Sequence, residues 1–293
     1  MLIRSTYNSR LRYLAHQTAK TGGDLGKIQE QITTGKRINR ISDEPWSASE
    51  IHQLRNALVR QVEYSGSAKN GYALLSTVET ALTTAMGIVQ RGRELAVQGG
   101  NDSLDNDQRN GIAAEVLMLK DRLSQVVNTK LHNRYIFSGA AHNIPPMDSS
   151  YTYQGGSNDA KLYVSDSTSV AVGYVGRNIF GDATGGVFKA VDDLANALTS
   201  NDGDLIRSAI DDFSDAFDLM DRYRTKVGLS TTIVDDMEDL NAQLEIDLQT
   251  RLSSIEEVDM AEALTKFSLI QTQYEVNIQL TSQSRSMSLF SRI

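Results

Sequence analysis

Histidine and acidic side chains are the residues of this chain that could hold a metal ion. The four histidines are scattered and lack the spacing of a helical zinc-binding pair: His16, His52, His132 and His142. Three acidic doublets also occur: Asp211-Asp212, Asp235-Asp236 and Glu256-Glu257. Neighbouring residues on a helix point about 100° apart, so a doublet does not clasp one ion. We therefore expect no metal site and interpret the doublets as a solvated acidic face.

Motifs for nucleophilic catalysis and phosphate binding are missing from the sequence. Cysteine is absent, which excludes thiolate nucleophiles, disulfides and cysteine-ligated metals. There is no glycine-rich phosphate loop, no dinucleotide-binding G-x-G-x-x-G and no G-x-S-x-G nucleophile elbow. We predict that the protein is not an enzyme and uses no cofactor. The alternative is an enzyme on a helical scaffold, with any catalytic site in residues 135–185.

Charge is unevenly distributed along the 293 residues, whose net charge is −8. Residues 1–40 hold eight Lys/Arg against two Asp/Glu, whereas residues 201–262 hold seventeen Asp/Glu against five Lys/Arg. A basic end can bind nucleic acid, but these basic residues lack interleaved aromatic residues and a nucleic-acid-binding fold. We therefore expect a solvated or partner-facing helix surface and no nucleic-acid binding.

Membrane and leader segments are not evident in the sequence. No apolar run approaches the ~20 residues that span a bilayer, so we expect no membrane insertion. The N-terminal sequence Met-Leu-Ile-Arg-Ser-Thr lacks the apolar core and cleavage site of a secretory signal peptide. If the protein leaves the cell, we expect another export route.

The two ends of the chain carry thin apolar stripes at helical spacing. The stripe of the first 40 residues consists of Leu11, Leu14, Leu25, Ile28 and Ile32. The stripe of residues 259–293 consists of Leu264, Phe267, Ile270, Tyr274 and Ile278. Polar residues dilute both stripes, among them Thr18, Thr21, Asn277 and Thr281. Such helices depend on packing for most of their stability, so we expect the ends to finish folding only against copies or relatives of the chain.

Long helices are predicted between these ends, because the chain contains only three prolines: Pro45, Pro145 and Pro146. Capping-box sequences predict helix starts at Ser47 to Glu50, Asp105 to Gln108 and Asp259 to Glu262. The first of these runs should stop at Gly99-Gly100, and the second should continue to Leu131 as the other half of a helical hairpin. The longest run, Leu205 to Ile255, keeps its heptad spacing throughout and predicts a coiled-coil-like bundle.

Residues 134–182 are rich in glycine and contain short β-like runs at Tyr151–Tyr153, Lys161–Val164 and Ser169–Val172. A short helix is expected over 187–199. We predict a mainly α fold, a nested long-helix bundle formed by the N- and C-terminal halves with a small β-rich insert in the middle. The expected parts are 1–45 with 258–293 as a terminal coiled coil, 46–134 with 186–257 as the bundle, and 135–185 as the β-rich domain.

Several short segments give the chain a resemblance to a known family. Gly35-Lys-Arg-Ile-Asn39, followed by Ser42-Asp-Glu-Pro45 and Ala48, resembles the flagellin superfamily signature S/T-G-K-R-I-N-x-x-S-D-D-P-x-x-A, with Glu44 in place of the second Asp. Three segments resemble the branch of that superfamily that joins the flagellar hook to the filament: Arg134–Gly139, Tyr153–Gly156 and Gly176–Phe180. The shared C-terminal ending is resembled by Asp259–Glu262, Gln271–Tyr274 and Ser288-Leu289.

The resemblance implies an axial structural protein of the bacterial flagellum, located outside the cell and exported unfolded by the flagellar type III apparatus. It implies a junction layer between the first hook-associated protein and the flagellin filament. The implied partners are copies of the chain itself, the first hook-associated protein, flagellin and a cytoplasmic export chaperone.

The resemblance also implies how the chain assembles. The two terminal stripes would pack against each other within and between subunits, and the β-rich domain would face outward. A loop would contact neighbouring subunits through Gly35, Lys36, Arg37, Asn39, Ser42, Asp43 and Pro45. Next to this loop lies Trp46, the only tryptophan, which we expect to anchor the loop rather than to stack on a ligand.

Two alternatives to the junction role differ in testable features. Flagellin, the filament subunit, shares the ends and the long helices but lacks the segments at Arg134–Gly139 and Gly176–Phe180. A secreted coiled-coil effector that binds or inserts into host membranes is more distant. Such an effector would carry a strongly apolar helix or hairpin, which the sequence does not show.

Overall fold

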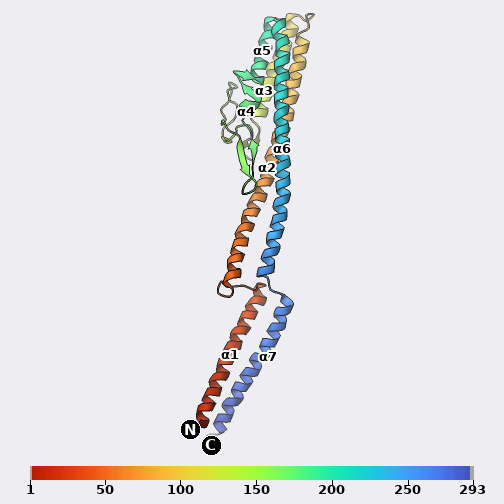
Figure 1. Ribbon diagram of the computed structural model, residues 1–293. Coiled ribbons are helices and arrows are strands. Elements are labelled where there is room, and N and C mark those ends of the chain that lie inside the picture. The colour runs from red at the N-terminus through yellow and green to blue at the C-terminus, as the bar shows by residue number, and fades with distance from the viewer. Residues whose placement is uncertain (1, 291–293) are drawn as a thin grey trace. The chain divides into compact units, whose positions relative to one another are not determined.

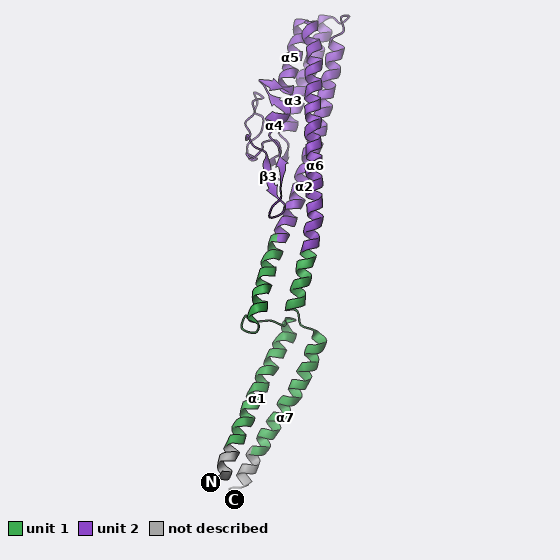
Figure 2. Ribbon diagram, viewed as in Figure 1, with its two compact units in different colours: residues 1–60, 245–293 green, residues 61–244 purple. Residues whose placement is uncertain are grey.

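The computed structural model of the chain describes residues 2–290, with side chains from Ser9 to Ser284. The chain divides into two compact units, residues 1–60 with 245–293 and residues 61–244 (Figure 2). The first unit contains both ends of the chain, and the second contains its middle. Ser288 and Leu289, which were part of the resemblance, lie outside the residues whose side chains are described.

The first unit contains two long helices, α1 (Leu2–Thr34) and α7 (Met260–Phe290), which lie side by side (Figure 1). Asp259 caps α7, because its carboxylate accepts hydrogen bonds from the backbone N–H groups of Ala261 and Glu262 at 2.9 and 3.2 Å. The helices predicted at the two ends of the chain are therefore confirmed, and so is the helix start at Asp259.

Two very long helices continue from the first unit into the second, α2 (Pro45–Gly99) and α6 (Gly203–Glu256). They have 55 and 54 residues, and both were predicted from their apolar periodicity. The predicted cap at Ser47 is wrong, because α2 already begins at Pro45, whose fixed φ suits the first helical position. Ser47 Oγ instead donates a hydrogen bond to Glu44 Oε2 at 2.9 Å.

Two shorter helices complete the bundle of the second unit, α3 (Asn106–Val127) and α5 (Val187–Ser200), and they pack against each other. α3 begins with the predicted capping box, in which Asp105 Oδ1 accepts from Gln108 N–H at 2.8 Å and Gln108 Oε1 accepts from Asp105 N–H at 3.0 Å. The hairpin of α2 and α3 and the short helix near 187–199 are confirmed, but the predicted continuation of the second helix to Leu131 is wrong, because α3 ends at Val127 and Leu131 lies in a short strand.

Short strands connect α3 to α5 and form three two-stranded antiparallel sheets. The pairs are β1 (Lys130–Leu131) with β2 (Arg134–Tyr135), β3 (Ala160–Tyr163) with β4 (Ser169–Gly173), and β5 (Gly181–Asp182) with β6 (Gly185–Gly186). A one-turn helix, α4 (Gly176–Phe180), precedes β5. The strands predicted near Lys161 and Ser169 are confirmed. The strand predicted at Tyr151–Tyr153 is wrong, because Tyr151 has φ of 58°, outside the β region.

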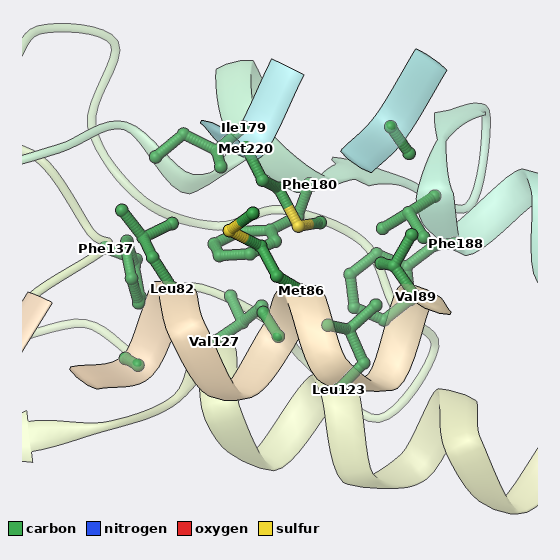
Figure 3. Close-up of a cluster of buried hydrophobic side chains, with 14 of the residues drawn as sticks. Leu82, Met86, Val89, Leu123, Val127, Phe137, Ile179, Phe180, Phe188 and Met220 are labelled. Carbon is green, nitrogen blue, oxygen red and sulfur yellow. The ribbon is translucent and has the colours of Figure 1, made fainter. Parts of the chain in front are cut away.

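Residues 128–186, which hold the strands and α4, are called the β segment, and a cluster of buried apolar side chains lies where this segment meets the bundle of the second unit. Figure 3 shows side chains from α2 (Leu82, Met86, Val89), α3 (Leu123, Val127), α5 (Phe188) and α6 (Met220) gathered around those of the β segment and α4 (Phe137, Ile179, Phe180). Phe137 and Phe180 form an edge-to-face pair with ring centroids 4.9 Å apart. The β segment is therefore attached to the bundle through aromatic side chains.

One helix in the described part of the chain, α2, is long and apolar enough to cross a membrane by length and composition alone. The expectation that no segment meets that test is wrong for this helix. The core helix of a bundle meets the same test because its buried face is apolar, and 44% of the stretch concerned is buried in the fold. The absence of membrane insertion stays a prediction.

Candidate assembly interface

The ten predicted interface residues lie along α1 and α7, and the fold places these two helices side by side. Only Ile28 is fully buried, at 6% exposed. Seven are half-buried: Leu11, Leu14, Leu25, Ile32, Phe267, Ile270 and Tyr274. Leu264 and Ile278 are 52% and 45% exposed. The pair therefore leaves most of these apolar side chains in contact with solvent.

Polar side chains occupy part of the seam between α1 and α7. Asn277 Nδ2 donates a hydrogen bond to Thr21 Oγ1 at 3.1 Å, and the hydroxyl oxygens of Thr18 and Thr281 lie 3.4 Å apart. A Cβ atom added at Gly22 would lie 3.2 Å from Cε2 of Tyr274, so glycine allows this close approach. The polar residues that dilute the two stripes therefore make specific contacts between the helices.

Further apolar side chains of α7, which the sequence pattern did not single out, also face solvent. Leu269, Val276 and Leu280 follow one another at steps of seven and four residues and so share one helix face. They are 59%, 46% and 45% exposed. A contiguous group of exposed apolar residues is typical of an interaction site. α7 therefore presents apolar side chains on more than the face that α1 covers.

The segments that follow α1 and α6 are far apart in the sequence but pair with each other in the first unit. Gly35 ends α1 with φ of 69°, a conformation that glycine adopts without strain. Its carbonyl oxygen accepts from Val258 N–H at 3.0 Å. An isolated antiparallel bridge follows between Lys36 and Glu257. Backbone hydrogen bonds thus hold the two connecting segments together.

Glu256, the last residue of α6, is buried between two cationic side chains. Its Oε1 atom accepts from Lys36 Nζ at 2.6 Å and from Arg55 Nη2 at 2.5 Å. Burial raises the pKa of the Glu256 carboxyl, but the hydrogen bonds and charges of Lys36 and Arg55 outweigh burial and lower that pKa. The interpretation of Glu256-Glu257 as a solvated doublet is therefore wrong for Glu256.

Arg37 caps the C-terminal end of α6. Its Nη2 atom donates to Ile255 O at 3.1 Å, and its backbone N–H donates to Glu256 O at 2.7 Å. These two carbonyl groups have no partner within the helix, and the helix dipole favours a cation at this end. Nη1 of Arg37 also donates to Glu44 Oε1 at 2.5 Å. Arg37 thus holds the loop to the end of α6.

The other loop residues predicted to contact neighbouring subunits have local partners or face solvent. Asn39 Nδ2 donates to the carbonyl oxygen of Lys36 at 3.1 Å, and the Asp43 carboxylate accepts a backbone N–H at 3.1 Å. Ser42 and Pro45 are exposed. Their contact with a neighbouring subunit stays a prediction.

Trp46 lies in the first turn of α2 and points into solvent, with 91% of its surface exposed. The expectation that it anchors the loop is therefore wrong within the chain. The cause is the start of α2 at Pro45, which places Trp46 on an outer face of the helix. Ile41 of the same loop is 66% exposed.

The histidine and acidic side chains that were considered as possible metal ligands are dispersed over the fold. His16, His52 and His132 are exposed and lie in α1, in α2 and in the turn between β1 and β2, respectively. Between residues 9 and 284, no group of three or more His, Asp or Glu side chains is placed to hold a metal ion. The features that the fold does bring together are the terminal helices and the loop around Glu256.

Comparison with known families covers both ends of the chain. The bacterial flagellin N-terminal helical region matches residues 6–142, which hold most of α1 together with α2, α3, β1 and β2. The bacterial flagellin C-terminal helical region matches residues 210–291, which hold most of α6 and α7. Between the two matches lie the strands from β3 onward, α4 and α5.

Individual relatives match nearly the whole chain. The flagellar hook-associated protein 3 of Salmonella typhimurium is 23% identical over 289 residues, covering 90% of this chain and 91% of the relative. The flagellin of Listeria monocytogenes is 24% identical over 272 residues, covering 90% of each. The crystal structure of hook-associated protein 3 from Legionella pneumophila gives a TM-score of 0.63 at 16% identity, covering 70% of this chain and 98% of that one. This likeness confirms the predicted mainly α fold with a small β-rich insert.

Proposed function

Because the chain belongs to the bacterial flagellin family, we propose that it forms the junction layer between the first hook-associated protein and the flagellin filament. Like its hook-associated and flagellin relatives, the chain is a structural component of the bacterial flagellum. It is not an enzyme. The finer assignment to the junction is supported by the match of hook-associated protein 3 to 90% of the chain.

The observation that carries the proposal is the incomplete burial of the terminal helix pair. Leu264, Leu269 and Ile278 stay about half exposed in the single chain. Complete burial of one such side chain contributes about 1.5–3 kcal/mol. Contact with α1 and α7 of neighbouring copies would supply this burial, so the terminal helices become stable as the layer assembles.

The layer grows by contacts that join different surfaces of neighbouring copies. A heterologous contact with a rotation that does not close builds an open helical array. In this arrangement the loop from Gly35 to Pro45 contacts a lateral neighbour, and the β segment faces outward.

Export and protection of the free chain follow from the same helices. We propose that the chain passes unfolded through the flagellar type III apparatus, which suits marginal terminal helices and a chain without disulfides. A cytoplasmic chaperone covers the exposed apolar faces of α7 until export. The chain then reaches the outside of the cell as a flagellar component.

Deletion of the gene tests the junction role. The expected result is intact hooks without filaments, with unpolymerised flagellin in the medium. Filaments of normal length in the deletion strain would contradict the proposal. A chain that lacks residues 264–293 should keep a folded bundle and still fail to restore filaments. Thermal unfolding of the purified truncated chain is the control for its folding.

Flagellin itself is the second candidate function, supported by the match of Listeria monocytogenes flagellin to 90% of the chain. The two roles differ in abundance, because a filament consists of many more subunits than a junction layer. If this chain is the dominant protein of sheared filaments, it is the filament subunit. If it is a minor component found with the hook, the junction role stands.

A further inference from the structure

Trp46, in the first turn of α2, is the most exposed of the large apolar residues whose side chains the structure describes, at 91%. Tryptophan is among the side chains that contribute most to protein interfaces when a partner buries them. Glu50 and Gln53 follow Trp46 at steps of four and three on the same face of α2, and both are exposed. The indole therefore projects from the first unit as a single aromatic side chain on a polar helix face.

The opposite face of α2 lines a cleft of about 470 Å³ in the first unit. Ala48 and Ile51 of α2 and Ile38 of the loop after α1 are buried and form the apolar wall of this cleft. Ala48 lies two residues after Trp46, so the two side chains point about 200° apart around the helix. The indole of Trp46 therefore points away from the cleft of its own chain.

Cationic side chains surround the apolar wall of the cleft. Lys36 and Arg55 line it, and both bind the buried carboxylate of Glu256. Arg40 also lines the cleft and pairs with Glu30 at 3.3 Å, an exposed pair that contributes little to stability. An acidic occupant would compete with Glu256 for its two cations. A neutral aromatic ring would leave both bonds intact and would gain a cation–π contact with the Arg40 guanidinium, so the cleft favours an aromatic occupant.

An indole and a cleft on opposite faces of one helix can join copies of the chain in a head-to-tail series. Clefts of roughly 300–1,000 Å³ bind small molecules, so this cleft is large enough for one indole ring. We propose that Trp46 of one copy inserts into the cleft of a neighbouring copy. The contact joins two different surfaces and leaves an indole free at one end of the series and a cleft free at the other, as in an open array. This inference rests on the proposed self-assembly and names the residues of one lateral contact.

Cysteine cross-linking tests the contact directly, because the chain has no cysteine of its own. Glu50→Cys places a thiol one turn after Trp46 on the same helix face and keeps the indole. His52→Cys places a second thiol in the cleft, which His52 lines. The matched control combines Glu50→Cys with Gln53→Cys, because Gln53 is exposed and lies seven residues after Trp46, on the face of the indole.

Hook–filament particles from cells that make each variant are treated with a short thiol–thiol cross-linker. The variant with Glu50→Cys and His52→Cys should give a series of covalent dimers, trimers and larger multimers, because every copy offers both faces. The single variants and the Gln53→Cys control should give none.

Three results of the cross-linking would overturn the inference. Dimers from a single variant would show a symmetric contact, a product with a different protein would show another occupant of the cleft, and no product from the Glu50→Cys and His52→Cys variant would show that the two faces do not meet. Absence of the wild-type chain from the particles would instead count against the proposed function.

Replacement of the indole provides a second, independent test. Trp46→Ala should reduce the amount of chain incorporated into the particles by about tenfold or more, as for a central residue of an interface. Trp46→Phe should recover most of this loss, because phenylalanine keeps an aromatic face. Trp46 is exposed in the free chain, so unchanged thermal unfolding is the expected control for folding. Equal incorporation of Trp46→Ala and the wild-type chain would contradict the contact.

A double-mutant cycle locates the cation that meets the indole. Arg40→Gln should reduce incorporation by about two- to fivefold through loss of the cation–π contact. The same substitution should cause no further reduction in a chain that already carries Trp46→Ala, because the two residues act through one contact. Independent, additive losses would show that Arg40 and Trp46 do not meet across the interface.

Discussion

The bundle of the second unit and the terminal helix pair of the first both consist of long helices, but they bury their side chains to very different extents. In the bundle, Leu75, Leu82 and Phe213 are at most 1% exposed. Among the described side chains of α1 and α7, only Thr21, Ile28 and Ala263 are buried. The bundle thus finds its packing partners within the chain, whereas the terminal pair leaves much of its apolar surface without one.

The contacts of the two regions also differ in strength. Complete burial of a large apolar side chain contributes about 1.5–3 kcal/mol, whereas a hydrogen bond such as that between Asn277 and Thr21 contributes about 0.5–1.5 kcal/mol. A region with few buried apolar contacts opens at low free energy. The terminal pair should therefore be the less stable region of the free chain.

Removing an aromatic ring from the core between the bundle and the β segment should have the largest effect on stability. Phe137 is fully buried and packs edge-to-face on Phe180. Phe137→Ala should lower the free energy of unfolding by about 3–5 kcal/mol, measured by urea denaturation. Tyr163→Ala is the control, because Tyr163 is 65% exposed and its loss should cost at most about 0.5 kcal/mol. Similar costs for both variants would refute tight packing of the core between the bundle and the β segment.

Two glycines of α2 allow a finer test of bundle packing. A Cβ atom at Gly92 would lie 2.6 Å from Cε1 of Phe213, whereas a Cβ atom at Gly87 would meet no atom within 4 Å. Gly92→Ala should therefore cost about 1–3 kcal/mol through overpacking. Gly87→Ala should stabilise the helix by about 0.5–1 kcal/mol. Thermal unfolding measures the stability change of each variant. Changes of the same sign would show that Phe213 does not approach Gly92 closely.

The buried carboxylate of Glu256 should give the first unit a dependence on pH. Its pKa is lower in the folded chain than its ordinary value of 4.5, so its contribution is present at neutral pH and is lost as the pH falls through the folded pKa. Glu256→Gln should cost about 1 kcal/mol at pH 7, because both cationic partners are partly exposed.

Amide hydrogen exchange at the end of α6 measures this effect locally. The difference between the wild-type chain and the Glu256→Gln variant should shrink as the pH is lowered below 4.5. Glu257→Gln is the matched control, since Glu257 is exposed and should show no such difference. A constant difference at all pH values would mean that the charge of Glu256 is not what stabilises the loop.

A substitution in the terminal pair should have the smallest effect on the free chain. Ile270 is only half-buried, so Ile270→Ala should lower the stability of the monomer by less than about 1 kcal/mol, measured by urea denaturation. The same substitution should strongly reduce recovery of the chain in hook–filament particles. Full recovery of the Ile270→Ala variant in the particles would show that Ile270 does not contribute to the proposed interface.

The parts of the fold that could be predicted from the sequence depend on local pattern. The run from Leu205 to Ile255 predicted α6 to within two residues at each end, and Asp105 with Gln108 predicted the start of α3. Contacts between distant positions could not be predicted in this way. Arg55 and Glu256 are 201 residues apart, and no periodicity indicates that they pair. Glu256 therefore looked like one of many solvated acidic residues.

The candidate interface shows the same limit. Helical spacing correctly placed the two terminal stripes on long helices, but it did not reveal the second apolar face of α7, because the residues of that face lie between those of the predicted stripe. Trp46 shows how a local rule can mislead. A tryptophan beside a proline is expected to anchor a turn, yet Pro45 starts a helix and Trp46 turns outward.

Amide hydrogen exchange of α1 and α7 in the free chain and in assembled particles tests most directly whether the terminal pair is completed by its neighbours. We expect fast exchange in α1 and α7 of the free chain, slow exchange in α2, α3, α5 and α6 of the bundle, and slow exchange in all six helices after assembly. Equal protection of the terminal pair and the bundle in the free chain would contradict completion of the terminal pair by its neighbours.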